Sequence, residues 1–206
     1  MEPLFDAAYL LTILCSGVAL TATSSAGSER FLFGVMALVL FCGDALHLAP
    51  RVASKFSERD LTKQLGFGKL AASITMTVFY VLLWRAGLLR YGADAVPGYA
   101  TAAVYALAAA RVALCLLPQN RWTRDGAPTA LSIARNVPFC ALGAAVAALF
   151  AAGNIADAVW MVVVISFACY IPVVLFARRA PKLGMLMLPK SCAYAALVLM
   201  GFVTAG

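Results

Sequence analysis

Seven long stretches of this chain carry almost no charge, and this feature limits its fold more than any other. An apolar helix of about 20 residues crosses a hydrocarbon core about 30 Å thick. Backbone amides find no water in that core, so such a stretch has to satisfy its hydrogen bonds as an α-helix. The predicted transmembrane helices are Leu4–Thr23, Phe31–Leu48, Phe67–Leu89, Gly98–Leu117, Asn136–Ala152, Ile155–Phe176 and Gly184–Ala205.

The composition supports one membrane domain that occupies residues 1–206. Only 12% of the 206 residues are charged and 64% are apolar, whereas soluble domains have about 25% and about half. The strict alternation typical of a membrane β-barrel is absent from the sequence. We therefore predict an all-α, polytopic bundle of about seven helices. Because no basic segment precedes the first apolar stretch, we expect that stretch to remain as a helix.

The basic residues predict the orientation of the helices. Connections on the cytoplasmic side of a membrane protein are enriched in Lys and Arg. Three basic residues, Arg30, Arg85 and Arg90, fall on the side opposite the N-terminus. We therefore expect a cytoplasmic N-terminus and an outside C-terminus, in a membrane such as the bacterial inner membrane. Twelve basic residues fall on the N-terminal side: Arg51, Lys55, Arg59, Lys63, Lys69, Arg121, Arg124, Arg135, Arg178, Arg179, Lys182 and Lys190.

Several classes of function are disfavoured by the same composition. The net charge of +7 comes from short connections rather than from a basic run, so we predict no nucleic-acid partner. The six cysteines are scattered through apolar stretches, and no metal cluster or nucleotide-binding loop is recognisable. The expected partners are membrane lipids and a small amphipathic or lipid ligand, without a metal or cofactor.

Ionisable residues inside the apolar stretches are the main candidates for a functional site, because burying charge in a bilayer is costly. Asp44 lies six residues before Pro50, and Arg111 lies seven residues before Pro118. Each is thus about 10 Å inside the N-terminal-side face. With Lys190, which enters the last helix from that side, they are expected to converge on one hollow. A structural ion pair is the alternative interpretation of the three.

Four more residues complete the candidate site at this depth. His47 lies three residues after Asp44 and shares its helix face, which predicts either a proton relay or a helix-end hydrogen bond. Tyr170 is the third candidate catalytic group, after Asp44 and His47, although aromatic packing is the commoner role of such a residue. Lys69 and Asn136 join Arg111 and Lys190 as predicted substrate-binding residues. A lysine such as Lys69 can also extend its ammonium to lipid headgroups.

The segment Gly43–Arg51 resembles the lysoplasmalogenase-like YhhN family of membrane enzymes, through its Gly-Asp pair, Leu-rich turn and Pro-Arg. The stretch from Gly66 to Tyr80 and the pair Arg178-Arg179 are also similar. The resemblance implies hydrolysis of the vinyl-ether bond of lysoplasmalogens, with Asp44 at the place of the family's catalytic aspartate. The chain departs from the family in its helix number, and Ser166–Tyr170 lacks the second, late acidic residue.

Three other interpretations remain open at this stage. A transporter for a small anionic or amphipathic molecule would use the basic layer for binding and Asp44 with His47 for titration. A light- or ligand-sensing receptor would bind its chromophore or ligand at Lys190 in the seventh helix. Such a receptor needs a carboxylate counterion in the third helix, and that helix carries Lys69 instead. A noncatalytic lipid-binding protein would need no second acid.

Overall fold

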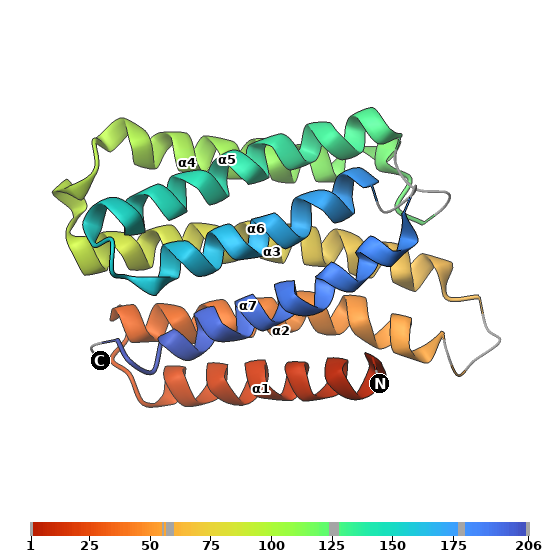
Figure 1. Cartoon of the computed structure of the whole chain (residues 1–206), viewed down its shortest axis with the longest axis horizontal. Coiled ribbons are helices and arrows are strands. Elements are labelled where there is room, and N and C mark those ends of the chain that lie inside the picture. Colours follow the sequence, from red (N-terminus) through yellow and green to blue (C-terminus); the bar gives the residue numbers. More distant parts are fainter. Residues whose placement is uncertain (1, 55, 57–59, 124–127, 177–179, 205–206) are drawn as a thin grey trace.

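In the part of the chain that the structure describes there are seven α-helices, which run side by side along the long axis of the computed structural model (Figure 1). The structure describes residues 2–54, 56, 60–123, 128–176 and 180–204. Short 3₁₀ turns at Ala93–Ala95, Pro118–Asn120 and Pro181–Leu186 separate some of the helices. The helices are α1 (Glu2–Ala22), α2 (Glu29–Ala53), α3 (Thr62–Tyr91), α4 (Gly98–Leu116), α5 (Thr129–Gly153), α6 (Ala158–Phe176) and α7 (Met187–Met200).

The number of helices agrees with the sequence prediction, but several ends differ. Helix α3 begins at Thr62 and not at Phe67, and α5 begins at Thr129 and not at Asn136. Hydropathy marks the part of a helix that fits the hydrocarbon core, whereas the helix itself continues into the polar layer. Asn136 therefore lies two turns inside α5. The last helix is shorter than predicted, because Pro181–Leu186 forms a 3₁₀ turn before it; Ala205, its predicted end, lies outside the described residues.

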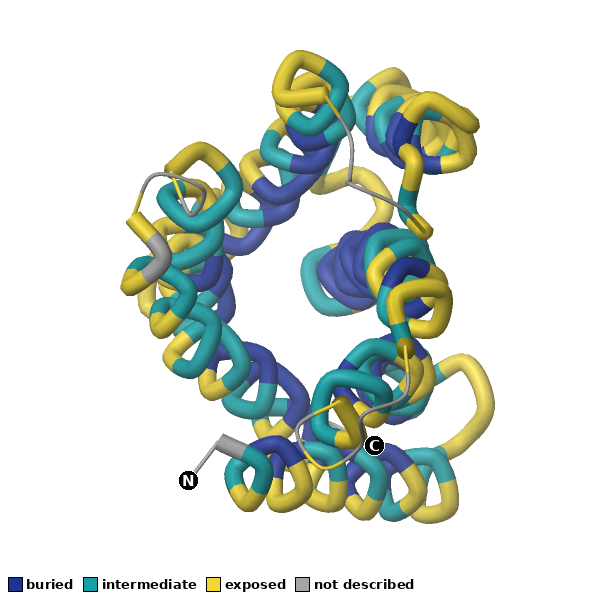
Figure 2. Tube along the Cα trace, turned by 90° about the vertical axis from the view of Figure 1, so that its right-hand side faces the viewer, coloured by how far each residue is buried: buried dark blue, intermediate teal, exposed yellow. Residues whose placement is uncertain are grey.

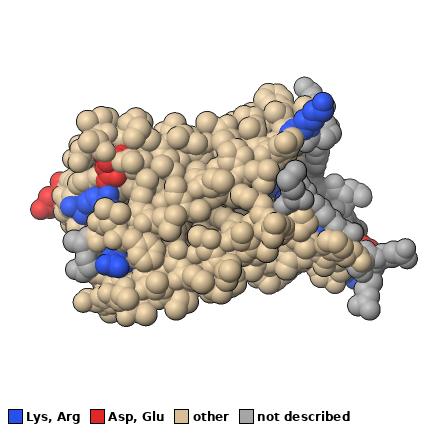
Figure 3. Space-filling view, turned by 60° about the horizontal axis from the view of Figure 1, so that its bottom comes forward, with Lys and Arg blue, Asp and Glu red and all other residues tan. Residues whose placement is uncertain are grey.

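Among the described residues, seven helical spans are long enough and apolar enough to cross a membrane, and the seventh, Lys182–Met200, includes most of the 3₁₀ turn before α7. One end of the bundle, here called the N-terminal end, holds the start of α1 and the α2–α3, α4–α5 and α6–α7 connections. The C-terminal end holds the other three connections and the end of α7 (Figure 1). The face visible in Figure 3 has its charged residues at these two ends, with an uncharged belt between them. Of the twelve basic residues assigned to the N-terminal side, Lys55, Arg59, Arg124, Arg178 and Arg179 lie outside the described residues.

The helices form a ring whose buried residues face inward (Figure 2). The ring closes where α7 packs against α1 and α2. The closest packing joins α2 to α3, where glycines let the two backbones approach. A Cβ at Gly68 would lie 2.3 Å from the carbonyl oxygen of Leu46 and 2.7 Å from the Cα of His47. Small residues at helix crossings allow such close approach in membrane proteins.

Candidate functional site

Asp44 lies on α2, with its carboxylate directed to α1. The Tyr9 hydroxyl donates a 2.7 Å hydrogen bond to Asp44 Oδ2. Tyr9 is buried, and its ring stacks on Phe5 with centroids 6.4 Å apart. On the other side of α2, Gly43 packs against Thr75 of α3. Asp44 is therefore held between α1 and α3 by a hydrogen bond on one side and a close helix crossing on the other.

A hollow of about 90 Å³ opens beside Asp44 at the N-terminal end. Residues from α1, α2 and α7 line it, so it brings together parts of the chain that are far apart in sequence. Two of the lining residues, Asp6 and Asp44, carry carboxyl groups that interact electrostatically. The other polar residues of its lining are His47, Arg51, Lys190, Ser191 and Tyr194.

Asp6 is the residue that sequence reasoning missed. It lies at the beginning of the first apolar stretch, three residues after Pro3. In the structure only 8% of its surface is exposed, and it lines the same hollow as Asp44. A signal was present in the sequence: Asp6 precedes Tyr9 by three residues, a spacing that puts both side chains on one helix face.

Lys190 also reaches the hollow, as predicted. Its ammonium lies 4.4 Å from the ring centroid of Tyr194 and 5.3 Å from that of Tyr170. Such contacts stabilise a cation through the ring quadrupole. Lys190 and Asp44 interact electrostatically, but no ion pair joins Lys190 to a carboxylate among the described residues. Its N–H donors thus stay available for an anionic group in the hollow.

His47 lines the same hollow as Asp44 and Lys190. Its Nδ1 is buried and has no hydrogen-bond partner within the described part of the chain. The close α2–α3 crossing at Gly68 fixes the backbone of His47. By contrast, Lys69 is exposed and does not line this hollow. Gly68 faces α2, and Lys69, one residue later, is turned by about 100° from that direction.

Arg111 does not converge with Asp44 and Lys190 on the hollow, contrary to expectation. It is only 3% exposed, and its Nη1 donates to Asn136 Oδ1 at 3.2 Å and to the Arg135 carbonyl at 3.3 Å. The guanidinium carbon lies 3.6 Å from the Phe139 ring centroid. Hydrogen-bond acceptors and an aromatic ring of the neighbouring α5 thus hold Arg111. These contacts form a second set of polar residues, separate from the hollow at Asp44.

Asn136 is the centre of that second set. Its Oδ1 also accepts a 2.6 Å hydrogen bond from the Tyr170 hydroxyl, and its Nδ2 donates to the Ser132 carbonyl at 2.7 Å. The structure therefore brings together three of the predicted residues, Arg111, Asn136 and Tyr170. Tyr170 connects the two sets, because its ring faces Lys190 while its hydroxyl faces Asn136.

Aromatic rings fill the interior between the two sets. Tyr80 makes ring contacts with Phe139, Phe167 and Tyr194, with centroids 5.2 to 6.5 Å apart. Ser166 is fully buried beside the hydroxyls of Tyr80 and Tyr194, although its Oγ makes no well-aligned hydrogen bond among the residues described. The late helix that lacks the expected acid thus contributes to an aromatic core.

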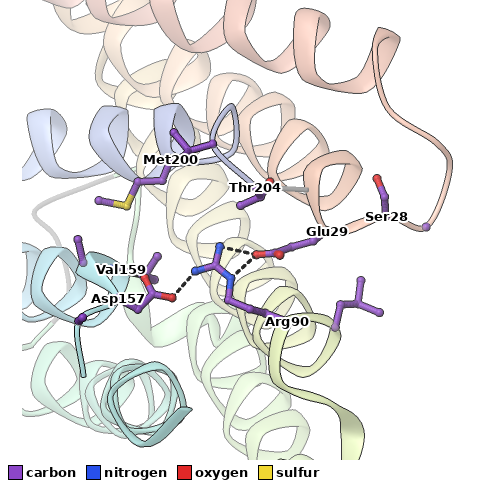
Figure 4. Close-up of a pocket in the computed structure, with 12 residues that line it drawn as sticks. Ser28, Glu29, Arg90, Asp157, Val159, Met200 and Thr204 are labelled. Carbon is purple, nitrogen blue, oxygen red and sulfur yellow. Dashed lines mark hydrogen bonds and ion pairs between the residues drawn. The ribbon is translucent and has the colours of Figure 1, made fainter. Parts of the chain in front are cut away.

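A separate network closes the C-terminal end of the bundle (Figure 4). Arg90, near the end of α3, lies between Glu29 at the start of α2 and Asp157 just before α6. Its Nε donates to Glu29 Oε1 at 2.8 Å, and the Tyr91 hydroxyl donates to Asp157 Oδ2 at 2.6 Å. We call Glu29, Arg90 and Asp157 the Arg90 clamp.

The Arg90 clamp borders a hollow of about 790 Å³. Asp157 has a pKa below its ordinary value of 3.8. Burial alone would raise it, but hydrogen bonds from Tyr91, the Val159 amide and Arg90 outweigh that effect. The carboxylate is therefore ionised at neutral pH. The Arg90 guanidinium donates to the carboxylates of both Glu29 and Asp157. This arrangement indicates a structural role, because it joins α2 and α3 to the start of α6.

Comparison with known proteins gives no further guide to the site. No protein-family model, curated protein or solved structure matches the chain.

Proposed function

We propose that this protein is a membrane-embedded hydrolase that cleaves the vinyl-ether bond of a lysophospholipid, in the manner of a lysoplasmalogenase. The observation that carries the proposal is the pair of carboxyl groups, Asp6 and Asp44, in one hollow with the ammonium of Lys190. Two carboxyl groups can divide the roles of acid and base between them. The excess of basic residues at the N-terminal end supports a cytoplasmic N-terminus in a bacterial inner membrane.

The proposed reaction begins with the protonated carboxyl group of Asp44. It transfers its proton to the vinyl-ether carbon farther from the oxygen, which leaves an oxocarbenium ion and an Asp44 carboxylate. A water molecule then adds its oxygen to the cationic carbon while Asp6 takes the released proton. The product of this step is a hemiacetal.

Collapse of the hemiacetal returns Asp44 to its protonated form and Asp6 to its carboxylate form. Asp44 takes the hydroxyl proton, the bond from carbon to the glycerol oxygen breaks, and Asp6 gives its proton to that oxygen. The products are a fatty aldehyde and a glycerophospho-headgroup. Lys190 supports this scheme because its unpaired ammonium faces the hollow where a phosphate would lie. Tyr9 positions Asp44 through its hydrogen bond, and His47 lines the hollow as a third proton carrier beside the two carboxyl groups.

The test measures aldehyde release by the purified protein in lipid nanodiscs, with an alkenyl lysophosphatidylethanolamine as substrate. Asp44→Asn and Asp6→Asn should each reduce the rate by about 100-fold or more, since general acid–base catalysis contributes about 10²–10⁴-fold. Asp94→Asn is the matched control, because Asp94 is an exposed carboxylate at the opposite end. It should retain full activity.

Two results would overturn the proposal. One is the absence of aldehyde release by the unmodified protein, and the other is undiminished release by Asp44→Asn. Vesicles that contain the protein serve as a parallel assay for transport. Movement of a lysophospholipid between leaflets without aldehyde release would replace the hydrolase with the transporter.

A further inference from the structure

Lys190 lies against two tyrosine rings that come from different helices. Tyr194 follows Lys190 by four residues on α7, a spacing that puts both side chains on one face of that helix. Its ring centroid lies 4.4 Å from the Lys190 ammonium. The Tyr170 ring comes from α6, and its centroid lies 5.3 Å from the same ammonium. The contact with Tyr170 therefore ties the ammonium to a neighbouring helix, which the contact within α7 cannot do.

The Tyr170 ring is itself fixed by its hydroxyl, which donates a 2.6 Å hydrogen bond to Asn136 Oδ1 on α5. The same oxygen accepts from Arg111 Nη1 of α4 at 3.2 Å, and Asn136 Nδ2 donates to the Ser132 carbonyl at 2.7 Å. An amide oxygen has two lone pairs, and Asn136 uses both. Its amide cannot turn without losing these bonds, so it holds the Tyr170 hydroxyl in one place.

These residues lie outside the hollow at Asp44. Arg111, Asn136 and Tyr170 are not among the described residues that line it. Lys190 does line it, and its ammonium contacts the Tyr170 ring. The contacts therefore form a chain from α4 through α5 and α6 to α7, and the end of that chain is the ammonium in the hollow.

We propose that Tyr170 is a positioning residue for Lys190. Asn136 and Arg111 hold the Tyr170 ring, and the face of this ring sets where the ammonium lies in the hollow. The inference rests on the proposed function, in which the ammonium binds the phosphate of the lysophospholipid. A cation is attracted to a ring only while the ring face is directed at it, so a Tyr170 ring that turns would release the ammonium. The second set of polar residues thus acts on substrate binding without touching the substrate.

The first test is a double-mutant cycle on the KM for the alkenyl lysophosphatidylethanolamine. Tyr170→Leu removes the ring and should raise KM about tenfold with kcat unchanged, the pattern expected when only binding is lost. Lys190→Ala should raise KM at least as far, and the double variant should raise it no further, because Tyr170 acts through Lys190. Tyr170→Phe keeps the ring and should raise KM less. Tyr105→Leu is the matched control, since Tyr105 is an exposed residue of α4 that does not line the hollow.

The second test needs no hydrolysis. Reductive methylation with isotope-labelled formaldehyde converts Lys190 to its dimethyl form, which keeps the positive charge, and loss of the NMR signal in Lys190→Arg assigns it. Ring currents should shift this signal away from that of the exposed Lys63. Tyr170→Leu should move it back towards the Lys63 position. Tyr170→Phe, which keeps the packing volume but not the bond to Asn136, should move it in the same direction by less.

An unchanged KM or an unchanged Lys190 signal in the Tyr170 variants would overturn the positioning role. Effects on KM that multiply in the double variant would also overturn it, since Tyr170 would then act independently of Lys190. A fall in kcat at unchanged KM would make Tyr170 a catalytic residue instead. Absence of aldehyde release by the unmodified protein would end the hydrolase proposal alone, because the NMR signal would still report whether Tyr170 places the ammonium.

Discussion

Removal of the cation from the Arg90 clamp tests whether this network holds the C-terminal end together. The side chains of Glu29 and Asp157 are only 12% and 11% exposed, and that of Arg90 is 22% exposed. Arg90→Gln would leave two largely buried carboxylates without their common partner. Breaking a buried ion pair from one side costs about 3–5 kcal/mol. Partial exposure of Arg90 puts the expected loss near the lower limit, at about 3 kcal/mol.

The assay is thermal unfolding in detergent, followed by loss of the monodisperse peak in size-exclusion chromatography. For a chain of this length, about 3 kcal/mol corresponds to a fall in Tm of roughly 6–12 °C. The triple variant Arg90→Gln/Glu29→Gln/Asp157→Asn removes the unpaired charges as well and should recover most of the loss, because a neutral replacement of a buried ion pair is often tolerated. An unchanged Tm in Arg90→Gln, or a triple variant as unstable as the single one, would refute the reasoning.

Three further predictions concern pH, packing and positioning. The pKa of Asp157 is lowered on folding, so the ionised carboxylate stabilises the protein above the unfolded pKa of about 3.9. This stabilisation disappears as the pH falls through the lower pKa of the folded state. The difference in Tm between the unmodified protein and Asp157→Asn should therefore be constant from pH 5 to 7 and vanish in stronger acid. Gly68→Ala forces a Cβ against the backbone of α2 and should cost about 1–3 kcal/mol, measured as a lower Tm, whereas Gly98→Ala, with nothing within 4 Å, should not. Tyr9→Phe removes the hydrogen bond to Asp44 and should lower aldehyde release about tenfold with a shifted pH profile; an unchanged profile would deny Tyr9 its positioning role.

The length and apolar character of the seven stretches were sufficient to predict the seven helices, because a bilayer leaves the backbone no other option. Their ends were less predictable, as the early start of α5 before Asn136 illustrates. The sequence did not predict which face of each helix points into the bundle. In lipid the outer face of a helix is as apolar as the inner face, so the periodicity that reveals the core of a soluble protein is absent.

This loss of periodicity explains which parts of the candidate site were found. The depth of Asp44, Arg111 and Lys190 followed from counting residues along each helix, and the structure does put Asp44 and Lys190 in one hollow. The separate position of Arg111 depends on which way α4 faces, and the sequence carries no sign of that. The pairing of Asp6 with Asp44 likewise depends on the packing of α1 against α2.

The Arg90 clamp also has a consequence for the order in which the chain is assembled during synthesis. Glu29 and Arg90 are 61 residues apart, and Asp157 follows 67 residues after Arg90. The α2–α3 hairpin can thus leave the translocon with its own ion pair formed, while Asp157 is still to be made on the ribosome. The second carboxylate joins only when the α5–α6 hairpin inserts, which makes closure of that end a late event in biogenesis.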